Sequence, residues 1–396
     1  MSPRVGLFGI LGSGNLGNDA SLDAVITFLR DRHPGVTLDF MCMGPDRVAE
    51  VYAAPATALQ WYEPHAGDAT GVRATALKIL GKLLDPFRTF AWVRRQDIVI
   101  VPGMGVLEAT LPLRPWAIPY SLFWLGVCAR LTGAKVALVS VGASVIRKRL
   151  TRTLITWTAR LAHYRSYRDE QSRDAMRRMG VDVTGDEVYP DLAFALPVPE
   201  PGPPTGMVGV GLMAYYSGND DRAQAGEIHE RYVAALTGFV RHLVDSGRPV
   251  RLFAGDVSDR PVVERIRTAV QGSSGAPVVV EPLTTMADLM TQLSTVDTVV
   301  ATRYHNVMSG LKLAKPTVSI GYAAKHDVLM AEMGLGEFCH SAKAVDLPVL
   351  IRQFEELESR HAELTATLVE RNQAARDRLE PQFAALSKLI ADTRGS

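Results

Sequence analysis

The sequence predicts an α/β protein with two domains, and three observations support this prediction. Strand-like and helix-like segments alternate through most of the 396 residues. Apolar runs such as IVIV at 98–101 and VALVSV at 136–141 are continuous blocks rather than alternations with polar residues. Such blocks are typical of parallel strands that are covered by helices on both faces. A proline-rich segment at 197–206 separates two regions that share this pattern.

The first domain is expected over residues 1–196. Apolar residues recur at helical spacing in 21–33, and further helices are expected at about 72–84 and 86–95. The expected strands of this domain are 4–10, 36–43, 97–103, 134–142 and 164–168.

The second domain is expected over residues 207–345. The linker before it, PVPEPGPPTG, contains five prolines and cannot continue a helix or a central strand. Residues 346–396 are expected to form C-terminal helices that are broken at Pro381. The expected strands of the second domain are 207–212, 250–255, 277–282, 297–302 and 316–321.

Composition excludes several classes of protein. Apolar residues make up 47% of the chain, which is too many for a disordered protein. The 43 basic and 42 acidic residues give a net charge of +1, so we expect no nucleic-acid partner. Three dispersed cysteines indicate neither a disulfide framework nor a zinc cluster, and they are typical of a reducing compartment such as the cytoplasm.

One apolar run bears on membrane contact. Residues 117–129 are too few to cross a bilayer, and Arg130 follows them. We interpret the run as a buried helix. The alternative is an interfacial helix at the inner face of the membrane, in contact with a membrane-bound substrate.

A glycine-rich turn follows the first expected strand. Gly12, Gly14 and Gly17 spell G-x-G-x-x-G, and Asp39 lies 22 residues after Gly17. This is the spacing of a dinucleotide-binding motif, but Asp39 falls inside the expected strand rather than at its end. A tight structural turn is a second interpretation. A loop whose backbone N–H groups face an anion or a substrate is the third.

Polar residues within this turn favour the third interpretation. Asn15, Asn18 and Asp19 are unusually polar for a purely structural turn, and their side chains suit sugar hydroxyls or donor oxygens. We therefore predict that Asn15, Asn18 and Asp19 bind substrate together with Gly14.

A second cluster follows two successive strands of the second domain. Arg303, His305 and Asn306 come after the strand that ends near Thr302, and Lys325 comes after the next strand. Ligands of open parallel sheets bind at the carboxyl ends of the strands, so these side chains are expected at one rim. Two permanent cations and one imidazole suit a small, doubly charged anion.

A third cluster belongs to the first domain. Arg168 ends the strand at 164–168, and this position makes it a candidate for a cleft between the domains. Asp191 occupies a similar position, with a helix or turn cap as the equal alternative. Histidines such as His305 and His326 lack the spacing of metal ligands, so neither a metal nor a redox cofactor is expected.

An ordered series of motifs resembles the polysaccharide pyruvyl transferases. The resemblance covers roughly residues 5–336, and its most specific part is the R-x-H block with the K-P turn and the Y-x-x-K segment that follow it. The blocks are GSGNLGNDA, DIVIVPGMGVLE, YRSYRDEQSRDAMRRMG, YPDLAFAL and ATRYHNVMSGLKLAKPTVSIGYAAKHDVLMAEMGL.

The resemblance implies a fold and a reaction. The fold would be two Rossmann-like domains facing a cleft, as in GT-B glycosyltransferases. The enzyme would move pyruvate from phosphoenolpyruvate to a sugar of a cell-surface glycan or its precursor, nucleotide- or lipid-linked. Arg168, Arg303 and Lys325 would neutralise the donor. His305 would protonate its methylene carbon, which makes His305 and Arg303 the expected catalytic residues.

Three other functions remain open at the level of sequence. A GT-B glycosyltransferase would use the same cations for the diphosphate of a nucleotide sugar. A non-catalytic protein of this fold would bind a sugar or an anion without releasing phosphate. An NAD-dependent enzyme would use the glycine motif. The sequence defines neither the acceptor sugar nor the oligomeric state.

Overall fold

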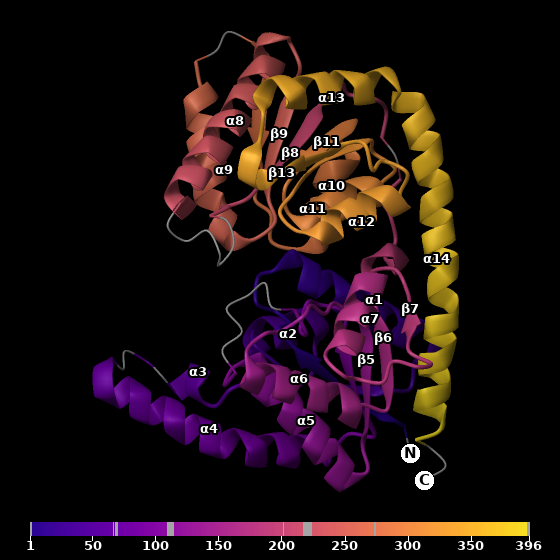
Figure 1. Cartoon of the computed structure of the whole chain (residues 1–396). Coiled ribbons are helices and arrows are strands. Elements are labelled where there is room, and N and C mark those ends of the chain that lie inside the picture. The colour runs from indigo at the N-terminus through magenta and orange to yellow at the C-terminus, as the bar shows by residue number, and fades with distance from the viewer. Residues whose placement is uncertain are drawn as a thin grey trace. The chain divides into compact units, whose positions relative to one another are not determined.

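The chain forms two compact units in the computed structural model, which describes residues 2–65, 67, 70–108, 115–200, 202–216, 224–272 and 275–393 (Figure 1). The N-terminal unit comprises Met1–Ser13, Asn18–Leu196 and Arg378–Ser396. The C-terminal unit comprises Gly14–Gly17 and Pro197–Asp377.

The N-terminal unit contains a seven-stranded parallel sheet in the order β3-β2-β1-β4-β5-β6-β7. Its strands are β1 (Arg4–Gly9), β2 (Thr37–Cys42), β3 (Ala56–Ala58), β4 (Ile98–Pro102), β5 (Lys135–Val141), β6 (Tyr164–Tyr167) and β7 (Glu187–Val188). Its helices are α1 (Leu16–Arg32), α2 (Pro45–Tyr52), α3 (Tyr62–His65), α4 (Gly71–Val93), α5 (Ile118–Thr132), α6 (Arg149–Leu161) and α7 (Glu170–Arg178). Every residue of β4 is buried, as the continuous apolar run predicts for a strand covered on both faces.

The C-terminal unit contains a six-stranded parallel sheet in the order β10-β9-β8-β11-β12-β13. Its strands are β8 (Val208–Leu212), β9 (Val250–Ala254), β10 (Val278–Val280), β11 (Thr298–Ala301), β12 (Thr317–Gly321) and β13 (Cys339–Ser341). The helices are α8 (Ala225–Asp245), α9 (Arg260–Val270), α10 (Met286–Ser294), α11 (Tyr304–Lys312), α12 (Ala324–Glu332), α13 (Leu347–Ser359) and α14 (His361–Ala391). The last turns of α14 group with the N-terminal unit.

The expected strands are confirmed, with ends that differ by one or two residues. Three short strands were not predicted: β3, β7 and β13, which extend the two sheets at their edges. Their sequences, ATA, EV and CHS, lack the apolar blocks that identify the central strands.

The structure corrects the prediction of two helices at 72–84 and 86–95. A single helix, α4, runs through Pro86. Proline at this position removes the N–H that would bond to the carbonyl of Lys82. The hydroxyl of Tyr120 in α5 donates to that carbonyl at 2.7 Å, so the freed acceptor is satisfied from a neighbouring helix.

The break expected at Pro381 is also wrong, because α14 continues through it. Contacts with the N-terminal unit hold the last turns of this helix. Phe383 stacks on Phe28 of α1 with ring centroids 4.8 Å apart, and Ser140 of β5 donates to the side-chain oxygen of Gln382. Proline is tolerated inside a helix when packing of this kind outweighs the lost hydrogen bond.

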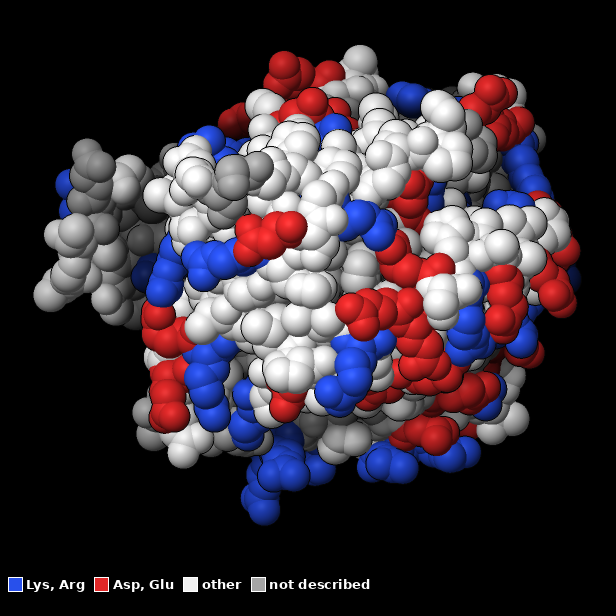
Figure 2. Space-filling model, turned by 90° about the horizontal axis from the view of Figure 1, so that it is seen from above, with Lys and Arg blue, Asp and Glu red and all other residues white. Residues whose placement is uncertain are grey.

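The run at 117–129 forms a buried helix, as predicted. Helix α5 buries Leu122, Leu125 and Cys128 between its neighbours α4 and α6. Among the helices that the structure describes, none has both the length and the apolar character needed to cross a membrane. On the face seen in Figure 2, basic and acidic side chains are intermingled, in line with the net charge of +1.

Candidate functional site

The carboxyl end of β11 in the C-terminal unit brings the second predicted cluster together. The strand ends at Ala301, and α11 begins at Tyr304, so Arg303 lies at the N-cap position of this helix. His305 and Asn306 fall in the first turn, where the unpaired N–H groups of a helix attract anions. Lys325 lies at the start of α12, just after β12.

A buried carboxylate fixes Arg303. Its Nε donates to Oδ2 of Asp259 at 2.8 Å, and its Nη2 donates to Oδ1 at 2.7 Å. Burial alone would lower the pKa of Arg303, but the hydrogen bonds and the charge of Asp259 raise it. The guanidinium is therefore permanently charged and held in one orientation.

Asp259 is in turn held by backbone groups. It is completely buried, and its carboxylate accepts from the N–H of Ala214 at 2.9 Å and of Gly255 at 3.3 Å. These two residues follow β8 and β9 respectively. The pair thus connects the carboxyl ends of three adjacent strands, β9, β8 and β11.

Aromatic rings connect Lys325 with His305. The Nζ atom of Lys325 lies 5.4 Å from the ring centre of Tyr304 and 5.6 Å from that of Tyr322. The His305 ring meets Tyr304 edge-on, with centroids 5.2 Å apart. Tyr304 therefore lies between Lys325 and His305, and the two polar groups belong to one rim, as predicted.

Asn306 is completely buried beside two glycines. A Cβ atom on Gly211 would lie 3.0 Å from its Nδ2, and one on Gly255 would lie 2.9 Å from its Oδ1. Within the described part of the chain, neither atom of the amide has a hydrogen-bond partner. An unsatisfied buried polar group costs roughly 1–3 kcal/mol, so this amide is a candidate for direct or water-mediated ligand contact.

His326 was considered in the sequence only as a metal ligand, but it has a structural position in this rim. The completely buried ring places Nε2 3.1 Å from the carbonyl oxygen of Thr302 and Nδ1 3.1 Å from that of Ala323. These contacts fix the end of β11 against the start of α12. No group of three or more His, Cys, Asp or Glu side chains gathers as a metal site among the described residues.

The glycine-rich turn places Asp19 in a buried position in the N-terminal unit. Its Oδ1 accepts from the N–H of Gly12 at 2.8 Å, and Arg47 lies 3.5 Å from its Oδ2. Burial raises the pKa of the Asp19 carboxyl, although the Gly12 hydrogen bond and the Arg47 charge oppose this. Gly12 and Gly14 have φ angles of +67° and +85°, which glycine adopts without strain.

Asn15 and Asn18 belong to the same turn, whereas Asp39 lies apart from it. Asn15 accepts from the N–H of Gly17 at 3.1 Å, at the start of α1, and Asn18 is partly exposed. Asp39 lies in the middle of β2, where its carboxylate accepts from Trp92 at 2.9 Å and from Gln96 at 3.1 Å. A ribose-binding acid of a dinucleotide site would have to lie at the strand end, so this arrangement disfavours that interpretation.

Arg168, also in the N-terminal unit, forms a buried ion pair that the sequence did not reveal. Its Nη2 donates to Oε1 of Glu108, and both side chains are almost completely buried. Gly142 at the end of β5 makes room for the pair, because a Cβ atom there would lie 2.7 Å from the Arg168 Nη2. Asp191 is a cap, since its carboxylate accepts from the N–H of Ala193 at 3.0 Å.

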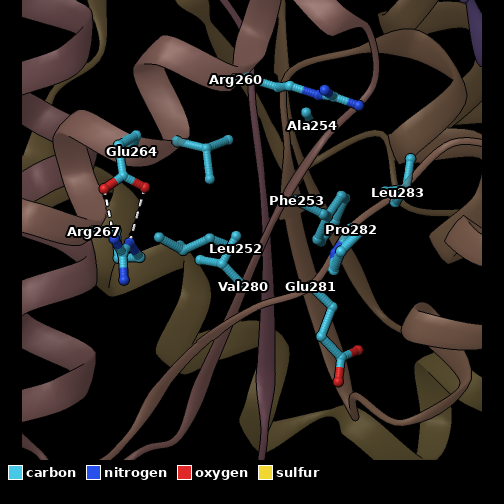
Figure 3. A pocket seen from close by; sticks show the side chains of 11 residues that line it. Leu252, Phe253, Ala254, Arg260, Glu264, Arg267, Val280, Glu281, Pro282 and Leu283 are labelled. Atoms are coloured by element: carbon cyan, nitrogen blue, oxygen red, sulfur yellow. Dashed lines mark hydrogen bonds and ion pairs between the residues drawn. The ribbon is translucent and has the colours of Figure 1, made fainter.

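A pocket of about 470 Å³ opens in the C-terminal unit between β9, α9 and the segment after β10 (Figure 3). Arg260, the residue directly after Asp259, lines it, and Glu264 and Arg267 on α9 form an ion pair at its wall. The apolar part of the lining includes Leu252 and Val280. The pocket therefore combines an apolar floor with charged groups of both signs.

Asp259 and Glu108, the partners of Arg303 and Arg168, were not predicted from the sequence, although each has a signal there. Asp259 ends the segment DVSD, which directly follows the strand-like run VRLFAG, so it lies near a strand end. Glu108 ends the block DIVIVPGMGVLE in the same way. Strand-end position alone was enough to mark both as candidates, but it could not pair them with Arg303 and Arg168.

Comparisons with known proteins agree with this architecture. The family model described as polysaccharide pyruvyl transferase matches residues 15–323. No curated protein matches the sequence at a significant level.

Solved structures resemble the whole chain, although their sequences are only distantly similar. The putative UDP-N-acetylglucosamine 2-epimerase from Listeria monocytogenes has a TM-score of 0.61 at 14% identity, covering 93% of this chain and 91% of its own. The UDP-GlcNAc 2-epimerase from Neisseria meningitidis, solved with UDP-GlcNAc bound, gives 0.59 at 10% identity with 98% and 100% coverage. A glycosyltransferase from Rickettsia africae gives 0.57 at 11% identity with 99% of each chain covered. The fold is thus the GT-B-like arrangement of two Rossmann-like domains, with a C-terminal helical segment.

Proposed function

The chain belongs to the polysaccharide pyruvyl transferase family, and on that premise we propose that it transfers pyruvate from phosphoenolpyruvate to a sugar. The acceptor is a sugar of a cell-surface glycan or its precursor, the product is a cyclic ketal, and inorganic phosphate leaves. The reaction takes place in the cytoplasm. Neither a metal nor a redox group takes part in the proposed steps.

The fixed Arg303 at the N-terminus of α11 is the observation that carries this proposal. Asp259 holds the guanidinium in a single orientation, so its outer edge is ready for an anion without loss of side-chain entropy. Lys325 and the N–H groups of the first helical turn add positive potential at the same rim. Phosphoenolpyruvate, with a phosphate and a carboxylate, matches this distribution of charge.

The reaction requires an acidic side chain near the methylene carbon of phosphoenolpyruvate. Protonation of that carbon leaves a cation-like centre at C2, to which one sugar hydroxyl adds. The C2–O bond to phosphate then breaks, and a second hydroxyl closes the ketal ring. Each sugar hydroxyl loses one proton. One of these replaces the proton that was added to the methylene carbon, and the other is taken up by phosphate or by the medium.

We assign His305 as the acid, because it lies in the first turn of α11 beside the proposed anion site. Asp19 is the second candidate, because burial raises the pKa of its carboxyl and so favours the protonated form. The two candidates belong to different units, and the substitutions given in the Discussion distinguish them.

Arg168 is proposed to bind the substrate. Its guanidinium lies just after β6 and is oriented by Glu108, as Asp259 orients Arg303, so it stays a proposed substrate-binding group. Gly14, Asn15 and Asn18 remain proposed substrate contacts on the glycine-rich turn.

The pocket in Figure 3 is the proposed site of the acceptor. It lies at the carboxyl ends of β9 and β10, one residue away from the Asp259 that holds Arg303. Charged groups of both signs offer donors and acceptors for sugar hydroxyls, and the apolar floor suits a ring face. The acceptor is nucleotide- or lipid-linked.

A GT-B glycosyltransferase that uses a nucleotide sugar is the alternative. Its support is the fold, since one of the similar structures holds UDP-GlcNAc. A non-catalytic sugar- or anion-binding protein of this fold is the other alternative. Family membership favours the pyruvyl transferase over both.

Phosphate release from phosphoenolpyruvate tests the proposal, measured across a panel of nucleotide- and lipid-linked glycans. The expected result is phosphate release that depends on one acceptor, together with the mass increase of a pyruvyl ketal. Hexose transfer from a nucleotide sugar without phosphate release would establish the glycosyltransferase instead. Binding of phosphoenolpyruvate with no turnover on any acceptor would favour the non-catalytic protein.

A further inference from the structure

Helix α4 of the N-terminal unit exposes a stripe of large apolar side chains. Phe87, Leu83 and Ile79 are 75%, 64% and 60% exposed, respectively. The spacing of four residues puts them on one face of the helix. Leu80 and Phe90 flank them and are also exposed. These five residues are called the α4 stripe, and an exposed apolar patch of this kind marks an interaction surface.

The opposite face of α4 packs against the rest of the N-terminal unit. Asp85, Thr89 and Trp92 are buried there, and the Trp92 indole donates to Asp39 of β2. The hydroxyl of Tyr120 anchors the helix to α5. The α4 stripe is therefore presented outward by a helix with a fixed orientation, and it is not a core face that lacks its partner. Figure 1 shows α4 along the outside of this unit, reaching past α5.

Charge next to the stripe has one predominant sign. Residues 70–95 contain six basic side chains and one acidic side chain, Asp85. That carboxylate is buried and engaged by Lys82 and Arg88, so these three side chains add little charge to the outer face. The exposed basic residues are Arg73, Lys78, Arg94 and Arg95. Arg94, directly after the helix, is exposed and continues the face of the stripe.

Helix α6 also combines exposed apolar side chains with basic residues. Leu150 and Trp157 are exposed on it, at 47% and 46%. Residues 144–161 contain five basic side chains and no acidic one. Helix α5 packs against both α4 and α6, so the three form one layer of the unit. Together, the α4 stripe, the exposed face of α6 and their basic residues form what we call the basic-apolar face.

We propose that the basic-apolar face docks on an anionic lipid bilayer, with the α4 stripe inserted at the level of the headgroups. A helix with apolar residues on one side and Lys or Arg next to them lies in the membrane interface. Aromatic residues such as Phe87 and Trp157 suit that depth. Negative lipids complement the basic excess, while pure apolar contact would not require it.

A second copy of the chain is a poorer occupant of this face. A two-fold symmetric contact places the same patch on both sides, so the basic residues of α4 and α6 would face one another. Such like charges oppose association, whereas an anionic bilayer neutralises them. The inference goes beyond the proposed function, because docking is independent of the reaction that the chain catalyses.

Vesicle sedimentation tests the docking. The full chain is mixed with vesicles of phosphatidylcholine alone or of phosphatidylcholine with phosphatidylglycerol. We expect binding to the anionic vesicles only, and loss of binding when ionic strength rises from about 0.1 M to about 1 M. The double substitution Leu83→Ser, Phe87→Ser is expected to weaken binding at least tenfold, in order-of-magnitude terms.

Two further variants make the test specific. Val369→Ser changes another exposed apolar residue, on α14, and is expected to leave vesicle binding unchanged. Arg94→Gln with Arg95→Gln keeps the apolar stripe and is expected to reduce the preference for anionic lipid. Circular dichroism of each variant checks that the fold is retained.

Three results would overturn the proposal. One is no binding of the full chain to anionic vesicles at low salt. Another is unchanged binding by the Leu83→Ser, Phe87→Ser variant. The third is a concentration-dependent dimer, seen by light scattering, that this variant abolishes, since that result would identify a second copy as the occupant.

Discussion

At the scale of single residues, the Arg303–Asp259 pair fixes the orientation of an arginine at the rim. A buried carboxylate with two backbone donors and a bidentate guanidinium is fully satisfied. Removing one member leaves the other charged and buried, which typically costs about 3–5 kcal/mol. The pair therefore keeps the arginine in one orientation, and each member depends on the other.

A double-mutant cycle measures this pairing. Asp259→Asn and Arg303→Met are each expected to lower the free energy of unfolding by about 3 kcal/mol or more, because each leaves an unmatched charge or polar group. The double variant is expected to lose less than the sum of the two. Urea unfolding of the four proteins checks this, and additive losses would mean that the two side chains are not coupled.

Matched amide substitutions test whether His305 or Asp19 is the catalytic acid. If His305 is the acid, His305→Gln keeps affinity for phosphoenolpyruvate and lowers kcat by at least about 10²-fold, because the amide cannot deliver a proton. Asp19→Asn is then expected to retain most of kcat. Steady-state kinetics at saturating donor decide between them, and the reverse pattern would transfer the role to Asp19.

Lys312 gives a prediction about pH. Burial, together with the charge of Arg376, lowers the pKa of Lys312 to about 7. Between about pH 7 and the ordinary lysine pKa of 10.5, the unfolded chain holds a proton on this side chain that the folded chain has released. Stability from this group therefore rises with pH across that window, by at most about 1.4 kcal/mol per pH unit.

Lys312→Met removes this dependence. The variant is expected to be more stable than the parent at about pH 6, where the buried ammonium is charged, and the difference is expected to shrink by about pH 9. Urea unfolding of both proteins at the two pH values gives the comparison. A difference that does not change with pH would contradict the lowered pKa.

At the scale of elements, α4 shows how a neighbouring helix can supply the hydrogen bond that a proline removes. The carbonyl of Lys82 loses its N–H partner at Pro86 and gains the hydroxyl of Tyr120. Helix propensity by itself would end the element there, and tertiary contact keeps it continuous.

Tyr120→Phe tests this account. Loss of the hydroxyl is expected to cost about 1–2 kcal/mol, because the freed carbonyl is left without a donor. In a Pro86→Ala background the same change is expected to cost less, since the new N–H of residue 86 can bond to the Lys82 carbonyl. Thermal unfolding of the four proteins checks this, and equal losses in both backgrounds would disprove the link between the two residues.

At the scale of the whole molecule, α14 contributes to the cores of both units. Residues up to Asp377 group with the C-terminal unit, and those from Arg378 group with the N-terminal unit. Leu364 is buried in the first part of the helix and Phe383 in the last part. The helix therefore supplies core side chains to two sheets that fold from separate stretches of sequence.

Hydrogen exchange resolves these contributions. Phe383→Ala removes the ring that stacks on Phe28, and a core truncation of this kind typically costs about 3–5 kcal/mol. We expect faster exchange in β1 and α1, with β8 and β11 little changed. Leu364→Ala is the matched control and is expected to give the opposite pattern. Equal loss of protection in both units would show that they unfold as one.

What the sequence by itself determined is the set of central strands, the proline-rich segment between two alternating regions, and the rim residues Arg303, His305 and Lys325. Continuous apolar runs identify buried parallel strands, and residues directly after such strands lie at one edge of the sheet. These are local patterns, so they are readable without knowledge of what packs against them.

Only the tertiary structure decided which partners those residues have. The pairs Arg303–Asp259 and Arg168–Glu108 join residues 44 and 60 positions apart, after different strands. The course of α4 through Pro86 depends on Tyr120, 38 residues away from Lys82. Pairing over such separations is set by strand order and side-chain burial, and neither leaves a periodic signal in the sequence. Local patterns therefore placed the rim residues, and the topology decided which charges lie beside them.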